Sequence, residues 1–170
     1  HLLPDPLRPR LYAINQNDKE QGSVLVIDTL THAVLRNIPV GLEPTDLALT
    51  EDSAELLVMN TSDPSIHRIN LETFETTEKI PLSEFSNRND DVGGHVIDGP
   101  GNIIYYIDEQ WGPRLRVFDT STQTVLQTFG STSTQSPNTN NDDGFGDVKI
   151  SPDGTRLFGW RQYGDGAGSS

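Results

Sequence analysis

The sequence predicts an all-β fold, a β-propeller of four-stranded antiparallel blades, and three observations support this. One short apolar run recurs four times, beginning at Arg10, Glu55, Ile103 and Arg156. Further short runs flank each copy, and turn-forming residues separate them. No apolar stripe of useful length has helical spacing. Repeats of roughly 40–50 residues with four short strands each are typical of propeller blades.

Two central strands are expected in each blade. The recurring run forms one of them: Arg10–Asn15, Glu55–Asn60, Ile103–Asp108 and Arg156–Arg161. A second run follows it in the first three copies: Ser23–Asp28, Ser65–Asn70 and Arg114–Asp119. Each of these ends on Asp or Asn, with a threonine three residues later. Because Asp and Asn side chains bond to the backbone two residues on, a tight turn should follow.

The remaining runs predict an outer and an inner strand. Two of the three outer runs contain a proline, Pro39 or Pro81, which edge strands tolerate and central strands do not. The outer runs are Val34–Val40, Thr76–Leu82 and Val125–Ser131. The inner runs are Thr45–Leu49, Gly94–Asp98 and Gly146–Ile150, and each leads into a short turn segment before the next central strand.

The predicted blades cover about three and a half units, at residues 10–40, 45–82, 94–131 and 146–163, followed by a Gly/Ser-rich tail at 164–170. In this prediction the first blade lacks its inner strand and the last lacks its two outer strands. Because an open arc of blades exposes strand edges, we expect closure with further blades or with other copies. A complete small open β domain is the alternative.

Three segments resemble the YVTN family of β-propeller repeats: Ser151-Pro-Asp-Gly-Thr-Arg-Leu-Phe158, the Arg10–Asn15 opening and the Val26-Ile-Asp-Thr-x-Thr31 turn. The resemblance covers nearly the whole chain. The chain departs from the family pattern at Thr50–Ser53 and Asp98–Gly101, where the family has Ser-Pro-Asp-Gly. The resemblance implies a propeller, commonly of seven blades, and a secreted, periplasmic or cell-surface location. It implies no single activity.

The composition narrows the choice of partners. The chain carries 12 basic and 25 acidic residues, a formal net charge of −13. Such a chain repels phosphate backbones and anionic membranes, which argues against nucleic acid and leaves cations, basic proteins, glycans and small molecules as ligands. The absence of cysteine excludes disulfides and thiolate chemistry. No apolar run approaches the ~18 residues of a transmembrane segment.

A candidate metal site lies where the inner strands begin. Asp46, His95 and Asp147 occupy the same position in successive repeats, a set of positions here called a column. In a propeller this column should line the mouth of the central channel. Oxygen ligands suit Ca²⁺ or another divalent cation, and the histidine admits a transition metal. Alternatively, polar residues at this position bond to the backbone of the neighbouring blade.

A candidate ligand-binding set lies in the connections on the same face. Long connections on a rigid scaffold frequently carry function. Two of them, between an outer strand and the next inner strand, are rich in Asn and Asp. A third, between the two central strands of the third blade, holds a tryptophan. The predicted ligand-binding residues are Asp108, Glu109, Trp111, Asp142 and Asp143. Alternatively, the Asn/Asp segments are solvated turns and Trp111 anchors its loop. His32 and His67 are expected at the surface.

No catalytic signature accompanies these residues: the sequence lacks His-Glu-x-x-His, Gly-x-Ser-x-Gly and a P-loop. This favours a non-enzymatic propeller that binds a protein, glycan or small molecule. The alternative, by analogy of fold alone, is a metal-dependent enzyme or enzyme subunit, lactonase-like or periplasmic-dehydrogenase-like, with its site at the channel mouth.

Overall fold

The computed structural model describes residues 1–16, 21–82, 94–108, 114–129, 147–151 and 155–160. Within these residues every regular element is a β-strand. The strands are β1 (Leu2–Pro4), β2 (Arg10–Asn15), β3 (Gln21–Asp28), β4 (Val34–Leu42), β5 (Pro44–Leu49), β6 (Glu55–Asn60), β7 (Ser65–Asn70), β8 (Thr76–Pro81), β9 (His95–Asp98), β10 (Ile103–Asp108), β11 (Arg114–Asp119), β12 (Thr124–Phe129), β13 (Asp147–Ile150) and β14 (Leu157–Trp160).

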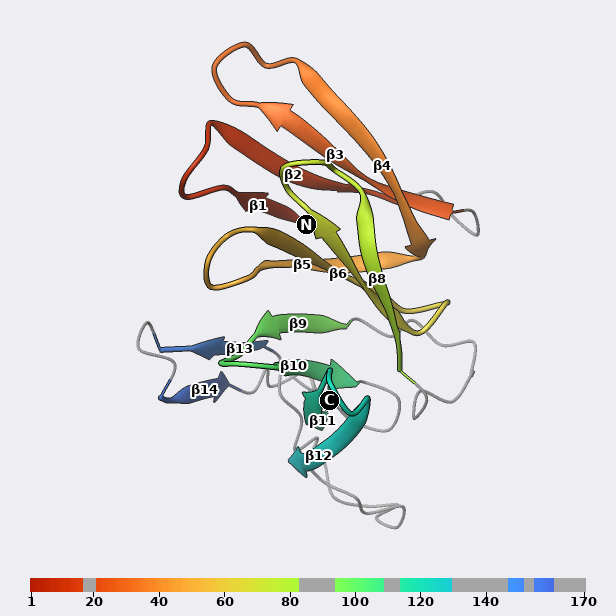
Figure 1. Ribbon diagram of the computed structural model, residues 1–170, viewed down its shortest axis with the longest axis vertical. Coiled ribbons are helices and arrows are strands. Elements are labelled where there is room, and N and C mark those ends of the chain that lie inside the picture. The colour runs from red at the N-terminus through yellow and green to blue at the C-terminus, as the bar shows by residue number, and fades with distance from the viewer. Residues whose placement is uncertain (17–20, 83–93, 109–113, 130–146, 152–154, 161–170) are drawn as a thin grey trace, which may run out of the picture.

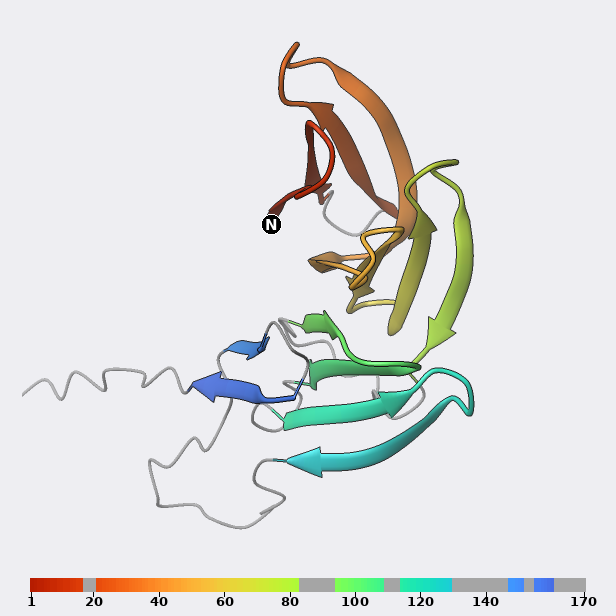
Figure 2. The ribbon, with the colours of Figure 1, turned by 60° about the vertical axis from the view of Figure 1, so that its left-hand side comes forward.

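The strands form four antiparallel sheets in chain order: β1 to β4, β5 to β8, β9 to β12, and the pair β13–β14. We call these blades 1 to 4. They follow one another like a fan, with blade 1 at one end and blade 4 at the other (Figures 1 and 2). Sequential antiparallel strands in successive sheets confirm the predicted propeller-type blades. The described part of the chain contains no helix long and apolar enough to cross a membrane.

The first blade begins earlier than predicted. Instead of starting at residue 10, it includes β1, whose Leu2, Leu3 and Pro4 pair with three residues of β2. The sequence analysis missed this strand because prolines stand at positions 4, 6 and 9, and a run of prolines is typical of a loop. Proline is tolerated here because β1 is bonded only to β2 in its sheet and Pro4 ends the strand. The structure thus describes fourteen strands instead of the predicted thirteen. The tail at 164–170 lies outside the described residues.

The predicted turns after the second central strand are confirmed. Asp28 Oδ1 accepts hydrogen bonds from the Leu30 and Thr31 N–H groups, both at 2.8 Å. Asn70 Oδ1 and Asp119 Oδ1 make the equivalent bonds in blades 2 and 3. The residue after the threonine has positive φ in each turn: His32, Phe74 and Gln123. One turn geometry is therefore repeated in three blades.

The hydrophobic core lies between the blades. Side chains alternate between the two faces of a strand, so each blade presents one apolar face to each neighbour. In blade 1, Tyr12, Val24 and Val26 face blade 2, where they meet Leu47 and Val58. The next interface repeats this arrangement with Leu57, Met59 and Ile66 of blade 2 against Val96, Ile104 and Tyr106 of blade 3.

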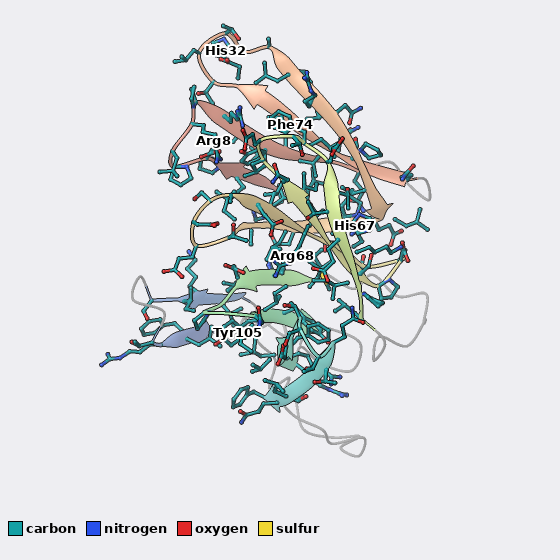
Figure 3. All side chains as sticks on the ribbon, viewed as in Figure 1. Arg8, His32, His67, Arg68, Phe74 and Tyr105 are labelled. Carbon is teal, nitrogen blue, oxygen red and sulfur yellow. The ribbon has the colours of Figure 1, made fainter. Side chains whose placement is uncertain are left out.

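The expectation of a surface position is wrong for His67. Its side chain is 9% exposed, and neither ring nitrogen has a hydrogen-bond partner. The cause is register: His67 pairs with Val58 on the face of blade 2 that packs against blade 1. His32 is exposed in its turn, as expected, and Figure 3 labels both residues.

Candidate functional site

The column that contains Asp46 and His95 joins blades 2 and 3. Asp46, near the start of β5, is buried, and its Oδ2 accepts a hydrogen bond of 3.0 Å from the Val96 N–H of β9. His95 Nδ1 lies 3.3 Å from the same oxygen. The structure thus brings Asp46 and His95 together as predicted. It also confirms the alternative that Asp46 bonds to the backbone of the neighbouring blade.

His1 adds a third member that the sequence analysis missed. Its carbonyl oxygen accepts the Ile14 N–H, which places it just before β1, in the same column. His1 Nδ1 lies 3.0 Å from Asp46 Oδ1, an oxygen that is buried and has no well-directed hydrogen bond. Two imidazoles therefore flank one buried carboxylate. Recognition of β1 in the sequence would have revealed this histidine.

The structure describes the side chains of only two of the three predicted metal ligands in this column. Asp147 pairs with Trp160 in β13–β14 and so holds the equivalent backbone position in blade 4, but its side chain lies outside the description. Among the residues described, no group of three or more His, Cys, Asp or Glu is arranged to hold a metal ion. The set Asp46, His95 and Asp147 stays a prediction.

The predicted ligand-binding residues lie mostly outside the described ranges. This applies to Glu109, Trp111, Asp142 and Asp143. Asp108 ends β10, where its backbone pairs with Arg114, and its side chain is not described. This set also stays a prediction.

A different site appears at the opposite end of the strands. Between blades 2 and 3, the turn after β5 and the end of β9 border an open hollow of about 720 Å³, which we call the acidic hollow. Its lining residues are Thr50, Glu51, Asp52, Ala54, Glu55, Arg68, Asn70, Asp98, Gly99 and Gly101. Six of these ten belong to the segments 50–53 and 98–101. These two segments differ from Ser151-Pro-Asp-Gly154, the equivalent turn of the last repeat, and that difference was the sequence signal for this site.

Hydrogen bonds hold the carboxylates of the acidic hollow in place. The Glu51 N–H donates to Asp98 Oδ2 at 3.0 Å and so connects the two blades. Asp52 Oδ1 accepts from the Thr50 hydroxyl at 2.7 Å and from the Ala54 N–H at 2.9 Å. The Ala54 N–H and the Thr50 hydroxyl lower the pKa of Asp52, which keeps this carboxyl ionised.

One cation lies in the lining. Arg68 extends from β7 toward blade 3 (Figure 3), and its Nη1 is 2.9 Å from Glu55 Oε2. Its Nε is also 3.4 Å from Glu78 Oε2, outside the lining. Arg68 is therefore engaged by two glutamates of its own blade. The lining contains four carboxylates and one guanidinium, so the acidic hollow is net negative.

The pKa of Asp98 is raised mainly by its burial in the acidic hollow. Burial raises the pKa of Asp98, and the charges of Asp52 and Glu51 raise it further, against the lowering effects of the Glu51 N–H and Arg68. A cation bound beside Asp98 would favour its ionised form. The chemistry that this arrangement supports is the attraction of a positively charged group.

Comparisons with known proteins show the fold alone. No protein-family model matches the chain, and no curated protein matches its sequence. Among solved structures, 280 chains match, so the fold is widely shared and does not by itself narrow the function.

Two of these structures illustrate the likeness. Hydrazine synthase of Kuenenia stuttgartiensis aligns over 94% of this chain and 40% of its own, with a TM-score of 0.68 and 23% identity. The β-propeller domain of Myceliophteria thermophila Cps50 (Swd1) aligns over 93% of this chain and 47% of its own, with a TM-score of 0.62 and 13% identity. The chain thus spans less than half of each.

Proposed function

We propose that this chain is a non-enzymatic β-propeller scaffold that binds a basic segment of a partner protein at the acidic hollow. The observation that supports the proposal is the hollow itself, where Glu51, Asp52 and Asp98 converge from two blades. The resemblance to YVTN repeats supports an exported or surface location for such a scaffold.

Charge and geometry favour an arginine or lysine side chain as the bound group. The net charge of −13 attracts a basic partner over a distance, and the hollow supplies the local contact. A planar guanidinium can donate two parallel hydrogen bonds to a carboxylate. Because Asp98 is partly buried, its attraction for a bound cation is screened less than that of a fully exposed carboxylate.

Calorimetric titration of a short arginine-rich peptide tests this proposal. The peptide should bind the wild-type chain, and the Asp52→Asn/Asp98→Asn double variant should weaken binding at least about tenfold, equal to about 1.4 kcal/mol. The matched control is Asp28→Asn/Asp119→Asn, which removes the same charge from the exposed turns of blades 1 and 3. Asparagine already performs that turn role at Asn70 in blade 2.

Binding should weaken with salt in the wild type, and more steeply than in the double variant of the hollow. Equal weakening by the two double variants would mean that overall charge, rather than the acidic hollow, attracts the peptide. No binding to the wild-type chain would remove the proposal.

The metal-dependent alternative rests on a different observation, the buried Asp46 Oδ1 beside His1 and His95. It is tested by metal analysis of protein purified without chelator, together with thermal shifts on addition of Ca²⁺, Mn²⁺ or Zn²⁺. Bound metal that is lost in Asp46→Asn would support the channel-mouth enzyme. Absence of both metal and thermal shift would exclude it.

A further inference from the structure

Two side chains of blade 2 fill the space between blades 1 and 2. Leu71 and Phe74 (Figure 3), in the turn after β7, belong to the apolar core that the two blades share. The guanidinium carbons of Arg10 and Arg36 lie 5.0 Å and 5.7 Å from the centre of the Phe74 ring, within the range of cation–π contacts. Arg10 Nη1 also donates to the Leu71 carbonyl oxygen at 2.9 Å. We call Leu71 and Phe74 the turn plug.

The equivalent turn of blade 3 carries no such plug. The two turns have the same hydrogen-bonded geometry, with positive φ at Phe74 and at Gln123. Thr120 stands in the place of Leu71, and Gln123 in the place of Phe74. Leu71 is fully buried, whereas Gln123 is exposed, and neither Thr120 nor Gln123 lines the acidic hollow. The space that the turn plug fills between blades 1 and 2 therefore lacks its apolar side chains between blades 2 and 3.

The charges at this position are opposite in the two interfaces. Arg10 of β2 and Glu55 of β6 hold the same register position, each paired with the first residue of its turn. Arg36 and Glu78 correspond in the outer strands. Two arginines therefore flank the turn plug, whereas their equivalents in blade 2 are two glutamates that hold Arg68. Because Glu55 also lines the acidic hollow, a plug between blades 2 and 3 would lie beside the hollow, in acidic surroundings.

The two aspartates of the acidic hollow are each held through one oxygen. Asp98 accepts the Glu51 N–H through Oδ2, and Asp52 accepts its two hydrogen bonds through Oδ1. No donor among the described residues bonds to Asp98 Oδ1 or Asp52 Oδ2. A guanidinium has five N–H donors in one plane, whereas an ammonium is a compact point charge. Acceptors on two different blades therefore favour arginine over lysine.

We propose that one arginine side chain of the partner enters the acidic hollow where the turn plug is missing, with its guanidinium between Asp52 and Asp98. The inference rests on the proposed function and deepens it, because it names the inserted residue and the two positions, Thr120 and Gln123, that leave room for it. The aliphatic stem of the arginine packs where Phe74 packs in the preceding interface, and its charged end reaches the carboxylates.

Filling the space from within the chain tests the inference without changing the charge of the acidic hollow. In Thr120→Leu/Gln123→Phe, blade 3 carries its own turn plug, and the arginine-rich peptide should bind at least about tenfold more weakly, because its guanidinium loses charged hydrogen bonds. The matched control is Thr29→Leu/His32→Phe, the same change in the equivalent turn of blade 1, which should leave binding unchanged. Far-ultraviolet circular dichroism checks that both variants fold.

A second peptide gives a readout that requires no variant. A lysine-rich peptide of the same length and charge should bind the wild-type chain at least about threefold more weakly than the arginine-rich one, because an ammonium does not serve two carboxylates in a fixed geometry. Equal affinity for the two peptides would overturn the inference. So would a plugged variant that binds the arginine-rich peptide as tightly as the wild type. Both results leave the proposed function standing, whereas no binding of either peptide to the wild type would remove both.

Discussion

Leu47 and Leu2 occupy the same register position in successive blades, yet 3% of one side chain is exposed and 64% of the other. The two leucines have the same local environment within their own sheets: each lies on the inner strand, paired with the next strand. They differ in the neighbour across the blade face, since blade 1 covers Leu47 and no described residue covers Leu2. In this fold a blade sets the direction of a side chain, and the adjacent blade sets its burial.

The same comparison applies to stability. Apolar side chains buried between blades contribute in proportion to the area that they remove from water. Their equivalents on the open face, which is the face of blade 1 that points away from blade 2, contribute less because no described blade covers them. Substitutions at paired positions of one column should therefore have very different effects.

The largest difference is expected in the column of Leu56 and Leu11. Leu56 is fully buried, so Leu56→Ala should lower the free energy of unfolding by about 2–5 kcal/mol through lost transfer energy and an unfilled cavity. Leu11 is half-buried on the open face, and Leu11→Ala should cost less than about half as much. Urea denaturation of dilute protein measures both. Equal losses would show that the equivalent faces of blades 1 and 2 are equally covered.

The next effect concerns the buried polar contact of blade 1. The Tyr12 hydroxyl donates a 2.6 Å hydrogen bond to Asp5 Oδ2, an oxygen that also accepts from Arg8. Tyr12→Phe should cost about 1–3 kcal/mol, because Asp5 loses a partner where water does not replace it. Burial and this bond raise the pKa of Tyr12 to about 12. One tyrosine should therefore ionise last in a titration followed at 295 nm, and that step should be missing in Tyr12→Phe.

A smaller effect is expected at His67, whose equivalent on the open face is Leu25. Burial lowers the pKa of His67 and Lys79 lowers it further, whereas Asp63 opposes the shift. The unfolded chain therefore takes up this proton at higher pH than the folded chain does. His67 should then reduce the free energy of unfolding as pH falls below about 6.5, and it should have no such effect above that value.

Substitution by the residue of the neighbouring blade isolates this contribution. His67→Leu should remove that part of the pH dependence and stabilise the fold by about 1 kcal/mol, because both ring nitrogens are buried without partners. Thermal denaturation between pH 5 and 8 measures the effect. An unchanged pH dependence in His67→Leu would show that His67 titrates alike in both states.

The smallest effect tests whether the turns are interchangeable. Asn70→Asp should leave stability nearly unchanged, because Asp28 and Asp119 make the same turn in blades 1 and 3. Asn70→Ala removes both side-chain hydrogen bonds of the turn and should cost about 1 kcal/mol. Thermal denaturation of the pair compares them. An aspartate variant as unstable as the alanine variant would contradict the repeat equivalence.

Local patterns predicted most of the fold. The Asp and Asn residues that close the turns and the prolines of the outer strands are readable from the sequence because their effects act over a few residues. β1 was missed because its prolines resemble those of a loop. The burial of His67 was missed because it depends on blade 1, which the local pattern around β7 does not describe.

The site was predicted less completely. Repeat alignment placed Asp46 and His95 together because one column lines one end of the blades. The alternative given for this position, a bond to the backbone of the neighbouring blade, is the one that Asp46 makes with the Val96 N–H. The acidic hollow depends on Glu51 and Asp98, which are far apart in the sequence and meet only through the packing of two blades. Its one sequence signal was the departure from the repeat pattern at those two segments.

Cysteine labelling at Leu2 and Leu47 tests the central comparison most directly. Single Leu2→Cys and Leu47→Cys variants place one thiol at the same register position in blades 1 and 2. In dilute protein, the thiol at position 2 should react with a maleimide nearly as fast as in the unfolded chain, and that at position 47 should react at least about a hundredfold more slowly. Equal rates at the two positions in the folded protein would contradict the account.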